Sequence, residues 1–129
     1  MTTPAARPDS VEAIRAALTA DPFAPVEWYR EPEDRDVCEP LIRALEDPLD
    51  LVRRAAVAAL ISRDDFYAAT PILWVLLHGS VPARTAAAEV LGSIATGDAL
   101  AIQYLSKALD DPDAGVRSAV ALSLEKVCR

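Results

Sequence analysis

The chain has 129 residues, which is enough for one domain with its own core and too short for two ordinary ones. Hydrophobic residues make up 52% of it, much of this alanine, and aromatic residues only 5%, a balance that favours closely packed helices. The net charge of −7 argues against a binder of nucleic acid or anionic membranes, and no apolar run is long enough to span a bilayer.

The N-terminal third of the chain carries all of the net negative charge. Residues 1–51 contain 12 acidic and 5 basic side chains, whereas residues 52–129 contain 8 of each. We expect a flexible N-terminus at 1–8 and a capping segment at 9–36, where Asp9 and Glu12 match a helical capping box. Its acidity has two interpretations, a polar end-cap of the fold or an acidic face for a basic partner.

The N-terminus lacks the apolar core of a secretory signal. The two cysteines, Cys38 and Cys128, lie far apart without metal-type spacing, so we expect a cytoplasmic protein without disulfides. Arginine outnumbers lysine, which hints at a GC-rich bacterial genome.

An internal repeat of about 32 residues begins at residue 37. Residues 41–48 (LIRALEDP) return as 105–112 (LSKALDDP), and a weaker copy lies midway. Each is followed by a second, alanine-rich segment, at 52–60, 83–91 and 116–124. We therefore predict three helix–turn–helix units over about 37–63, 65–95 and 98–128, because stacked helix pairs bury faces that one pair leaves exposed.

Turn and cap residues separate these predicted helices. The turns at 47–50, 79–82 and 111–115 contain Asp, Pro, Gly and Ser, which are turn formers. Asp36 and Glu39 match a second capping box, and Thr70–Pro71 predicts an N-cap followed by proline at the first helical position.

These units resemble HEAT repeats. A Pro-Leu-Ile-x-Ala-Leu helix, an Asp-Pro turn and Val-Arg-x-Ala-Ala-x-x-Ala-Leu carry the resemblance, which is closest to the short variety associated with phycobilisome lyases. It covers residues 37–127, and the middle unit departs from it with Gly79 and Ala83. The resemblance implies an all-α fold, a short right-handed α-solenoid of about three helix pairs with an N-terminal helical cap, and a repeat domain at 37–129.

Three arginines recur at equivalent positions, Arg53, Arg84 and Arg117, and Asp47 and Asp111 precede two of them by six residues. In HEAT-like families such residues resemble a structural ladder between successive turns. The alternative is a row of arginines that recognises a phosphate or a carboxylate.

No pattern of residues indicates catalysis. The single histidine, His78, suits the C-terminal end of a helix, and no second histidine exists for a His-rich metal site. Cys38, in the first turn of its predicted helix, is expected to be a packing residue, with a reactive thiol as the alternative. We expect no catalytic residue, no metal and no cofactor.

Two surfaces are candidate partner sites. The first is the face of the second helices, which lines the concave side in the resembling family. Its members differ between units while the core positions stay similar, and they are Arg54, Ala58, Ser62, Thr85, Glu89, Ser93, Ser118, Leu122 and Lys126. An unconstrained surface would vary in the same way.

The second candidate surface is the first helix of the middle unit. Trp74 and Val75 stand where the other units carry Ile42 or Ser106 and Arg43 or Lys107. Exposed, this pair would bind a partner or a second copy. We expect instead that the N-terminal segment, with Phe23, Trp28 and Tyr29, covers it.

The last predicted helix suggests a homodimer as a further possibility. Its apolar residues Val120, Leu124 and Val127 would leave an open stacking edge that a second copy covers. The alternative is that Ser123, Glu125 and Lys126 make the outer side of this helix polar enough to stay in solvent.

We therefore predict a non-catalytic protein–protein interaction module, an adaptor or scaffold whose partner is another protein rather than nucleic acid or membrane. The alternative is an accessory subunit, or a lyase- or chaperone-like protein, that acts on a cofactor-bearing partner. A DNA-binding HEAT-like protein is a further alternative, which the acidic charge disfavours.

Overall fold

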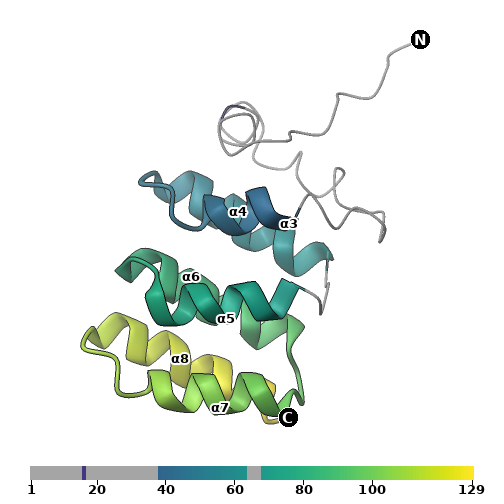
Figure 1. Ribbon diagram of the computed structural model, residues 1–129, viewed down its shortest axis with the longest axis vertical. Coiled ribbons are helices and arrows are strands. Elements are labelled where there is room, and N and C mark those ends of the chain that lie inside the picture. Colours follow the sequence, from purple (N-terminus) through teal and green to yellow (C-terminus); the bar gives the residue numbers. More distant parts are fainter. Residues whose placement is uncertain (1–15, 17–37, 64–67) are drawn as a thin grey trace. The chain divides into compact units, whose positions relative to one another are not determined.

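The computed structural model describes residues 38–63 and 68–129, together with the single residue Ala16, and its regular elements in these ranges are all helices (Figure 1). The chain divides into two compact units, residues 1–63 and 64–129. The predicted capping segment at 9–36 and the capping boxes at Asp9 and Asp36 lie outside the described residues.

The first unit contains one described helix pair, α3 (Cys38–Ala44) and α4 (Asp50–Arg63). Helix α4 buries residues at three- and four-residue spacing, which places them on one face. They are Val52, Ala55, Ala56, Ala59 and Leu60. Between the helices, the Asp47 carboxylate accepts a hydrogen bond from the Leu49 N–H at 2.9 Å, which closes the turn around Pro48.

The second unit stacks two helix pairs in two layers. Its helices are α5 (Ala69–His78), α6 (Val81–Ile94), α7 (Ala99–Ala108) and α8 (Ala114–Val127). The first helices α5 and α7 contact each other, and the second helices α6 and α8 pack together most extensively (Figure 1). This stacking of equivalent helices is the architecture that the sequence repeat predicts.

Side-chain caps start three of these four helices. The hydroxyl of Ser80 and the carboxylates of Asp98 and Asp113 each accept a hydrogen bond from the backbone N–H three residues further on. Each bond satisfies an N–H group that has no partner inside the helix.

The start of α5 differs from the prediction. The helix begins at Ala69 and not at Pro71, and the residue before it, Ala68, provides no side-chain cap. Thr70 therefore lies inside the first turn and is not the N-cap. Pro71 is tolerated there because the first four N–H groups of a helix have no intrahelical acceptor, so a missing donor breaks no bond.

Helices α6 and α8 come closest where Gly92 meets Ser123. A Cβ atom at Gly92 would lie 3.1 Å from the Cα of Ser123, so only glycine fits there without displacing α8. The buried hydroxyl of Ser123 donates a hydrogen bond to the carbonyl of Ala88. A small residue and a short polar side chain thus hold the two helices at close range.

The predicted open edge on α8 is largely wrong. Val120 and Val127 are fully buried, and only Leu124 is partly exposed. The loop between α6 and α7 also contacts this end of α8, because the N–H of Gly97 donates to the carbonyl of Val127 at 2.8 Å. Gly97 has φ +76°, a left-handed conformation that favours glycine. Two of the three residues on which the homodimer was predicted are therefore buried, and the oligomeric state stays a prediction.

None of the helices in the described ranges combines the length and apolar character needed to cross a membrane.

Candidate functional site

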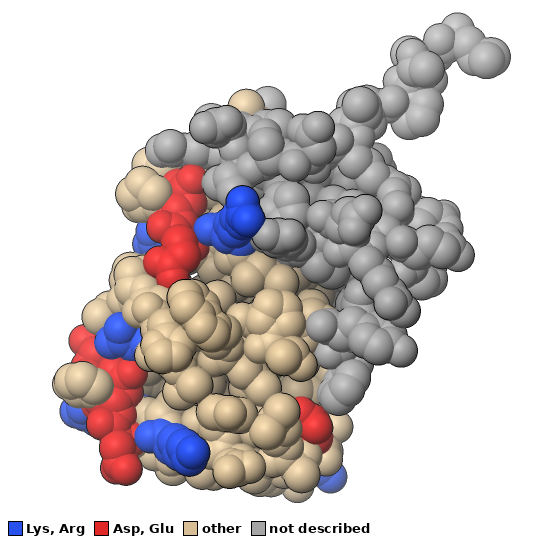
Figure 2. All heavy atoms as spheres, in the orientation of Figure 1, with Lys and Arg blue, Asp and Glu red and all other residues tan. Residues whose placement is uncertain are grey.

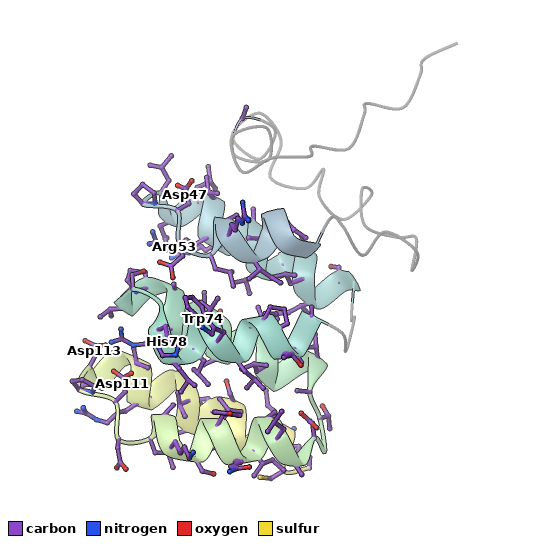
Figure 3. All side chains as sticks on the ribbon, in the orientation of Figure 1. Asp47, Arg53, Trp74, His78, Asp111 and Asp113 are labelled. Atoms are coloured by element: carbon purple, nitrogen blue, oxygen red, sulfur yellow. The ribbon has the colours of Figure 1, made fainter. Side chains whose placement is uncertain are left out.

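The exposed side of α5 presents an aromatic residue to solvent. Trp74 is 63% exposed, and the centroid of its ring lies 4.9 Å from the centroid of the His78 ring one turn further on. Figure 3 labels the two side chains next to each other on α5. Leu77 beside them is 41% exposed. We call this surface the Trp74 strip, and it comprises the exposed residues Thr70, Pro71, Trp74, Leu77 and His78.

The structure separates the predicted pair of Trp74 and Val75. Val75 is buried and presents no surface to a partner, although its counterparts Arg43 and Lys107 are exposed. An aliphatic side chain gains by leaving water, whereas a long charged one keeps its head in it. Most of the Trp74 side chain is exposed. The expectation that the N-terminal segment covers it stays a prediction. Phe23, Trp28 and Tyr29 lie outside the described residues.

The exposed residues of α6 and α8 form a second candidate surface. On α6, Glu89 and Ser93 are exposed and Thr85 is partly exposed, its hydroxyl donating to the Val81 carbonyl at 3.1 Å. On α8, Ser118, Leu122 and Lys126 are exposed, Leu122 at 62%. Since each set is spaced by four residues and the two helices pack together, we call them the second-helix stripe.

In the first unit, the predicted residues of α4 are also exposed. Ala58 and Ser62 face solvent, and Arg54 forms an ion pair with Asp50 at 2.8 Å. Both partners of this pair are largely exposed, so it contributes little to stability.

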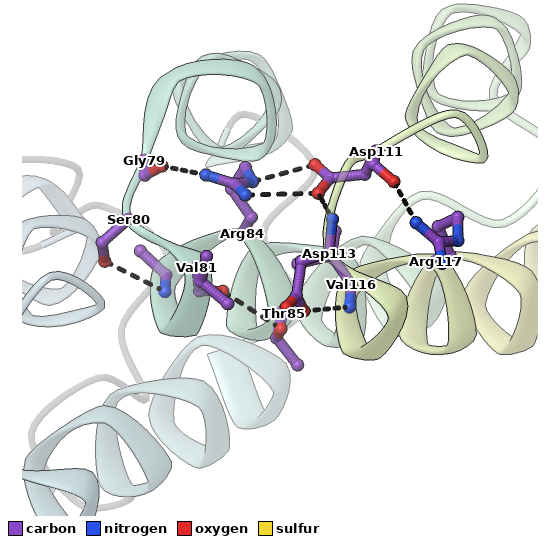
Figure 4. A network of polar contacts seen from close by, with 10 residues as sticks. Gly79, Ser80, Val81, Arg84, Thr85, Asp111, Asp113, Val116 and Arg117 are labelled. Atoms are coloured by element: carbon purple, nitrogen blue, oxygen red, sulfur yellow. Dashed lines mark hydrogen bonds and ion pairs between the residues drawn. The ribbon is translucent and has the colours of Figure 1, made fainter.

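A network of polar contacts joins the two turns of the second unit (Figure 4). The guanidinium of Arg84 donates from Nε and Nη2 to the two carboxylate oxygens of Asp111, at 2.9 and 3.2 Å. Its third nitrogen, Nη1, donates to the Gly79 carbonyl at 2.8 Å. Both side chains are largely buried, so this bidentate pair is a rung between successive turns, as the ladder interpretation predicts.

All three recurrent arginines use Nη1 in the same way. Arg53 donates to the Asp47 carbonyl at 2.7 Å and Arg117 to the Asp111 carbonyl at 2.6 Å. Each of these two bonds ties the start of a second helix to the turn that precedes it. The recurrent arginine thus orders the turn of its own helix pair in each of the three described pairs.

The carboxylate of Asp111 is also bound within its own turn, by the Asp113 N–H at 2.9 Å. Burial raises the pKa of Asp111, but the bond from Asp113 and the charges of Arg84 and Arg117 outweigh it and hold the pKa below its ordinary value. Asp111 is therefore ionised at neutral pH and serves as a fixed acceptor.

Acidic and basic side chains of the second unit gather along the edge formed by its turns, where they alternate, and the surface over α5 is largely uncharged (Figure 2). Among the residues that the structure describes, no group of three His, Cys, Asp or Glu side chains is placed to hold a metal ion. His78 is the last residue of α5, as predicted, and Cys38 is the first residue of α3.

The prediction that Ser123 lies on the polar outer side of the last helix is wrong, because its side chain is buried. It is a polar residue in an otherwise apolar row of α8, with Val116, Val120 and Val127 around it. A buried polar side chain in such a row needs a hydrogen-bond partner, so a serine among these valines predicts a buried hydrogen bond.

The stacked, equivalent helix pairs and the arginine–aspartate rung define a helix-pair repeat protein. A family model of HEAT repeats matches residues 38–125, and the chain belongs to the HEAT-repeat family. No curated protein matches the chain.

Proposed function

We propose that this chain is a non-catalytic protein-interaction module, an adaptor or scaffold that binds its partner through the Trp74 strip. The HEAT-repeat assignment supports the general class, because HEAT repeats are commonly protein-interaction modules. The proposal takes residues 37–129 as the repeat domain and 9–36 as its N-terminal cap.

The exposure of Trp74 is the observation that carries this proposal. An indole that is 63% exposed leaves a large apolar surface in water, and Leu77 and Pro71 extend that surface along α5. Tryptophan is enriched among the residues that dominate binding at protein interfaces. The strip contains no Lys, Arg, Asp or Glu, so a partner can cover it without desolvating one of these charged side chains.

The test compares Trp74→Ser with Leu122→Ser. The two side chains are 63% and 62% exposed, but they belong to the Trp74 strip and the second-helix stripe respectively. Quantitative affinity capture from the native host should yield a protein that binds wild type and Leu122→Ser equally and loses at least tenfold on Trp74→Ser. The reverse pattern would assign binding to the second-helix stripe instead.

A spectroscopic readout tests the same contact with the purified partner. The chain has two tryptophans, so Trp28→Phe leaves Trp74 as the only one. Its fluorescence emission should be that of an exposed indole and should shift to the blue when the partner binds. An unshifted spectrum in the complex would place the interface elsewhere.

The similarity to the short phycobilisome-lyase variety of repeat stays a prediction from the sequence. It is the basis for the alternative of an accessory protein that acts on a cofactor-bearing partner.

A further inference from the structure

The two recurrent arginines of the second unit, Arg84 and Arg117, are bound to different extents. Arg84 uses all three of its guanidinium nitrogens, one on its own turn and two on the carboxylate of Asp111. Arg117 makes the same bond to its own turn through Nη1. Within the described chain its Nε and Nη2 have no partner, and Figure 4 shows a single contact reaching it.

The face of α8 that carries Arg117 is also exposed, whereas the equivalent face of α6 is buried. Helices α6 and α8 are related by an offset of 33 residues at both ends. Ala88 and Leu91 of α6 and its C-cap Ala95 follow Arg84 on one face and are fully buried. The equivalent Ala121 of α8 and its C-cap Cys128 are exposed, and Leu124 is partly exposed.

We propose that the Nε and Nη2 edge of Arg117 is a binding site for a carboxylate on a turn of a partner protein. We call this edge the Arg117 fork. The Arg84–Asp111 rung shows the geometry, in which two parallel N–H groups meet both oxygens of one carboxylate. The bond from Nη1 to the Asp111 carbonyl already orders the Arg117 side chain, so the partner need not order it on binding.

The charges around the fork favour a single carboxylate over a polyanion. Asp110, Asp111 and Asp113 lie in the turn just before Arg117. These acidic groups repel an extended anion such as a nucleic acid, whereas one carboxylate aligned on the fork gains two charge-assisted hydrogen bonds.

The residue at position 125 favours a turn over a stacked helix pair. The close approach of α8 to α6 needs Gly92, and the equivalent residue of α8 is Glu125, whose side chain is 68% exposed. A helix cannot approach α8 there as closely as α8 approaches α6. Glu125 lies two helical turns from Arg117, about 12 Å along the axis, so a short turn can reach the fork without meeting it.

The test uses a cyclic peptide with the chain's own turn sequence LDDPDA, residues 109–114, which presents the carboxylate that Arg84 binds. Its binding is followed by NMR of the arginine Nε–H groups of the full chain. The Arg117 signal should shift and saturate with a Kd on the order of millimolar. The Arg84 signal should stay in place, because its fork is occupied.

Matched probes and variants isolate the carboxylate and the fork. In the first probe, Asn replaces the third residue of LDDPDA, the equivalent of Asp111, and this peptide should bind about tenfold more weakly. In the protein, Arg117→Lys should weaken binding of the parent peptide about fivefold, because lysine keeps the charge but lacks the paired N–H groups. Equal binding of the two peptides, or an unmoved Arg117 signal, would overturn the assignment. A phosphoserine peptide that binds tenfold more tightly would replace it with a phosphate site.

This inference rests on the proposal that the chain binds a protein, but not on the Trp74 strip. The Trp74→Ser variant should therefore bind the peptide as wild type does, and a loss of binding would count against the fork. Self-association that Arg117→Gln abolishes in sedimentation would instead identify the occupant as a second copy. If the peptide does not bind but Trp74→Ser still abolishes partner capture, the proposed function is supported and the assignment of the Arg117 fork is rejected.

Discussion

Asp111 is the residue on which most of the polar order in the second unit depends. Its carboxylate accepts from Arg84 in the preceding turn and from Asp113 in its own, and its carbonyl accepts from Arg117. Through its side chain and its carbonyl, this one residue connects two turns and orders the start of α8. A substitution at this position should therefore weaken the polar contacts of both helix pairs.

Asp111→Asn should destabilise the protein by about 1–3 kcal/mol, because the amide places a donor against the largely buried Arg84. The free energy of unfolding from urea titration at neutral pH measures this loss. Glu125→Gln is the control, since its ion pair with Arg129 spans 3.8 Å and both side chains are exposed, and it should cost less than about 0.5 kcal/mol. Equal effects of the two substitutions would refute the rung.

The same carboxylate should make stability depend on pH. Folding lowers the pKa of Asp111, so its contribution is complete above the ordinary value of 3.8 and is lost as the pH falls through the lower folded value. The difference in unfolding free energy between wild type and Asp111→Asn should therefore be constant near neutrality and shrink below about pH 4. A difference that persists undiminished at about pH 2 would contradict it.

Among the helices, the contact of α6 with α8 sets how closely the second unit packs. Its centre is Gly92 against the backbone of Ser123, with the Ser123 hydroxyl bonded to the Ala88 carbonyl. A glycine inside a helix costs about 1 kcal/mol relative to alanine, so its presence here reflects the close packing.

Gly92→Ala should lower the free energy of unfolding by about 1 kcal/mol. Overpacking against the Ser123 backbone costs about 1–3 kcal/mol, and the better helix propensity of alanine offsets about 1 kcal/mol of that. Ser93→Ala, on the exposed side of the same helix, should change stability by less than about 0.5 kcal/mol. A stabilised Gly92→Ala protein would show that α8 moves away without cost.

Sequence periodicity predicted the helix pairs because a repeat near 32 residues constrains every element at once. It failed at single positions where the environment, and not the period, decides. The repeat register assigned Val75 to the surface because Arg43 and Lys107 are exposed, yet the aliphatic side chain is buried. Thr70 looked like a cap, but α5 starts before it.

The sequence predicted one part of the candidate sites and could not predict another. The exposed residues of the second helices followed from four-residue spacing, and the structure shows them at the surface. The sequence could not show that Arg84 is occupied and the Arg117 fork open, because that difference depends on a carboxylate 27 residues from Arg84.

For the molecule as a whole, the distribution of charge bears on the class of partner. The net charge is −7, and on the face that Figure 2 shows, basic side chains alternate with acidic ones at the turns and form no separate patch. Binding to the phosphate backbone needs several uncompensated cations on one surface.

The full chain should therefore show no retardation of duplex DNA in a gel-shift assay at about 0.15 M salt and micromolar protein. Lowering the salt to about 0.05 M should not produce a complex, because the long-range field of the protein repels the polyanion. A salt-sensitive complex of micromolar affinity would restore the DNA-binding alternative.

Glu125 also limits how such a repeat array can grow in evolution. A tandem duplication of α7 and α8 would place a new second helix against α8, where the array would meet Glu125 in the place of Gly92. Because of that one side chain, the last described repeat is a poor template for its own copy. A longer array of this kind would first have to exchange Glu125 for a small residue.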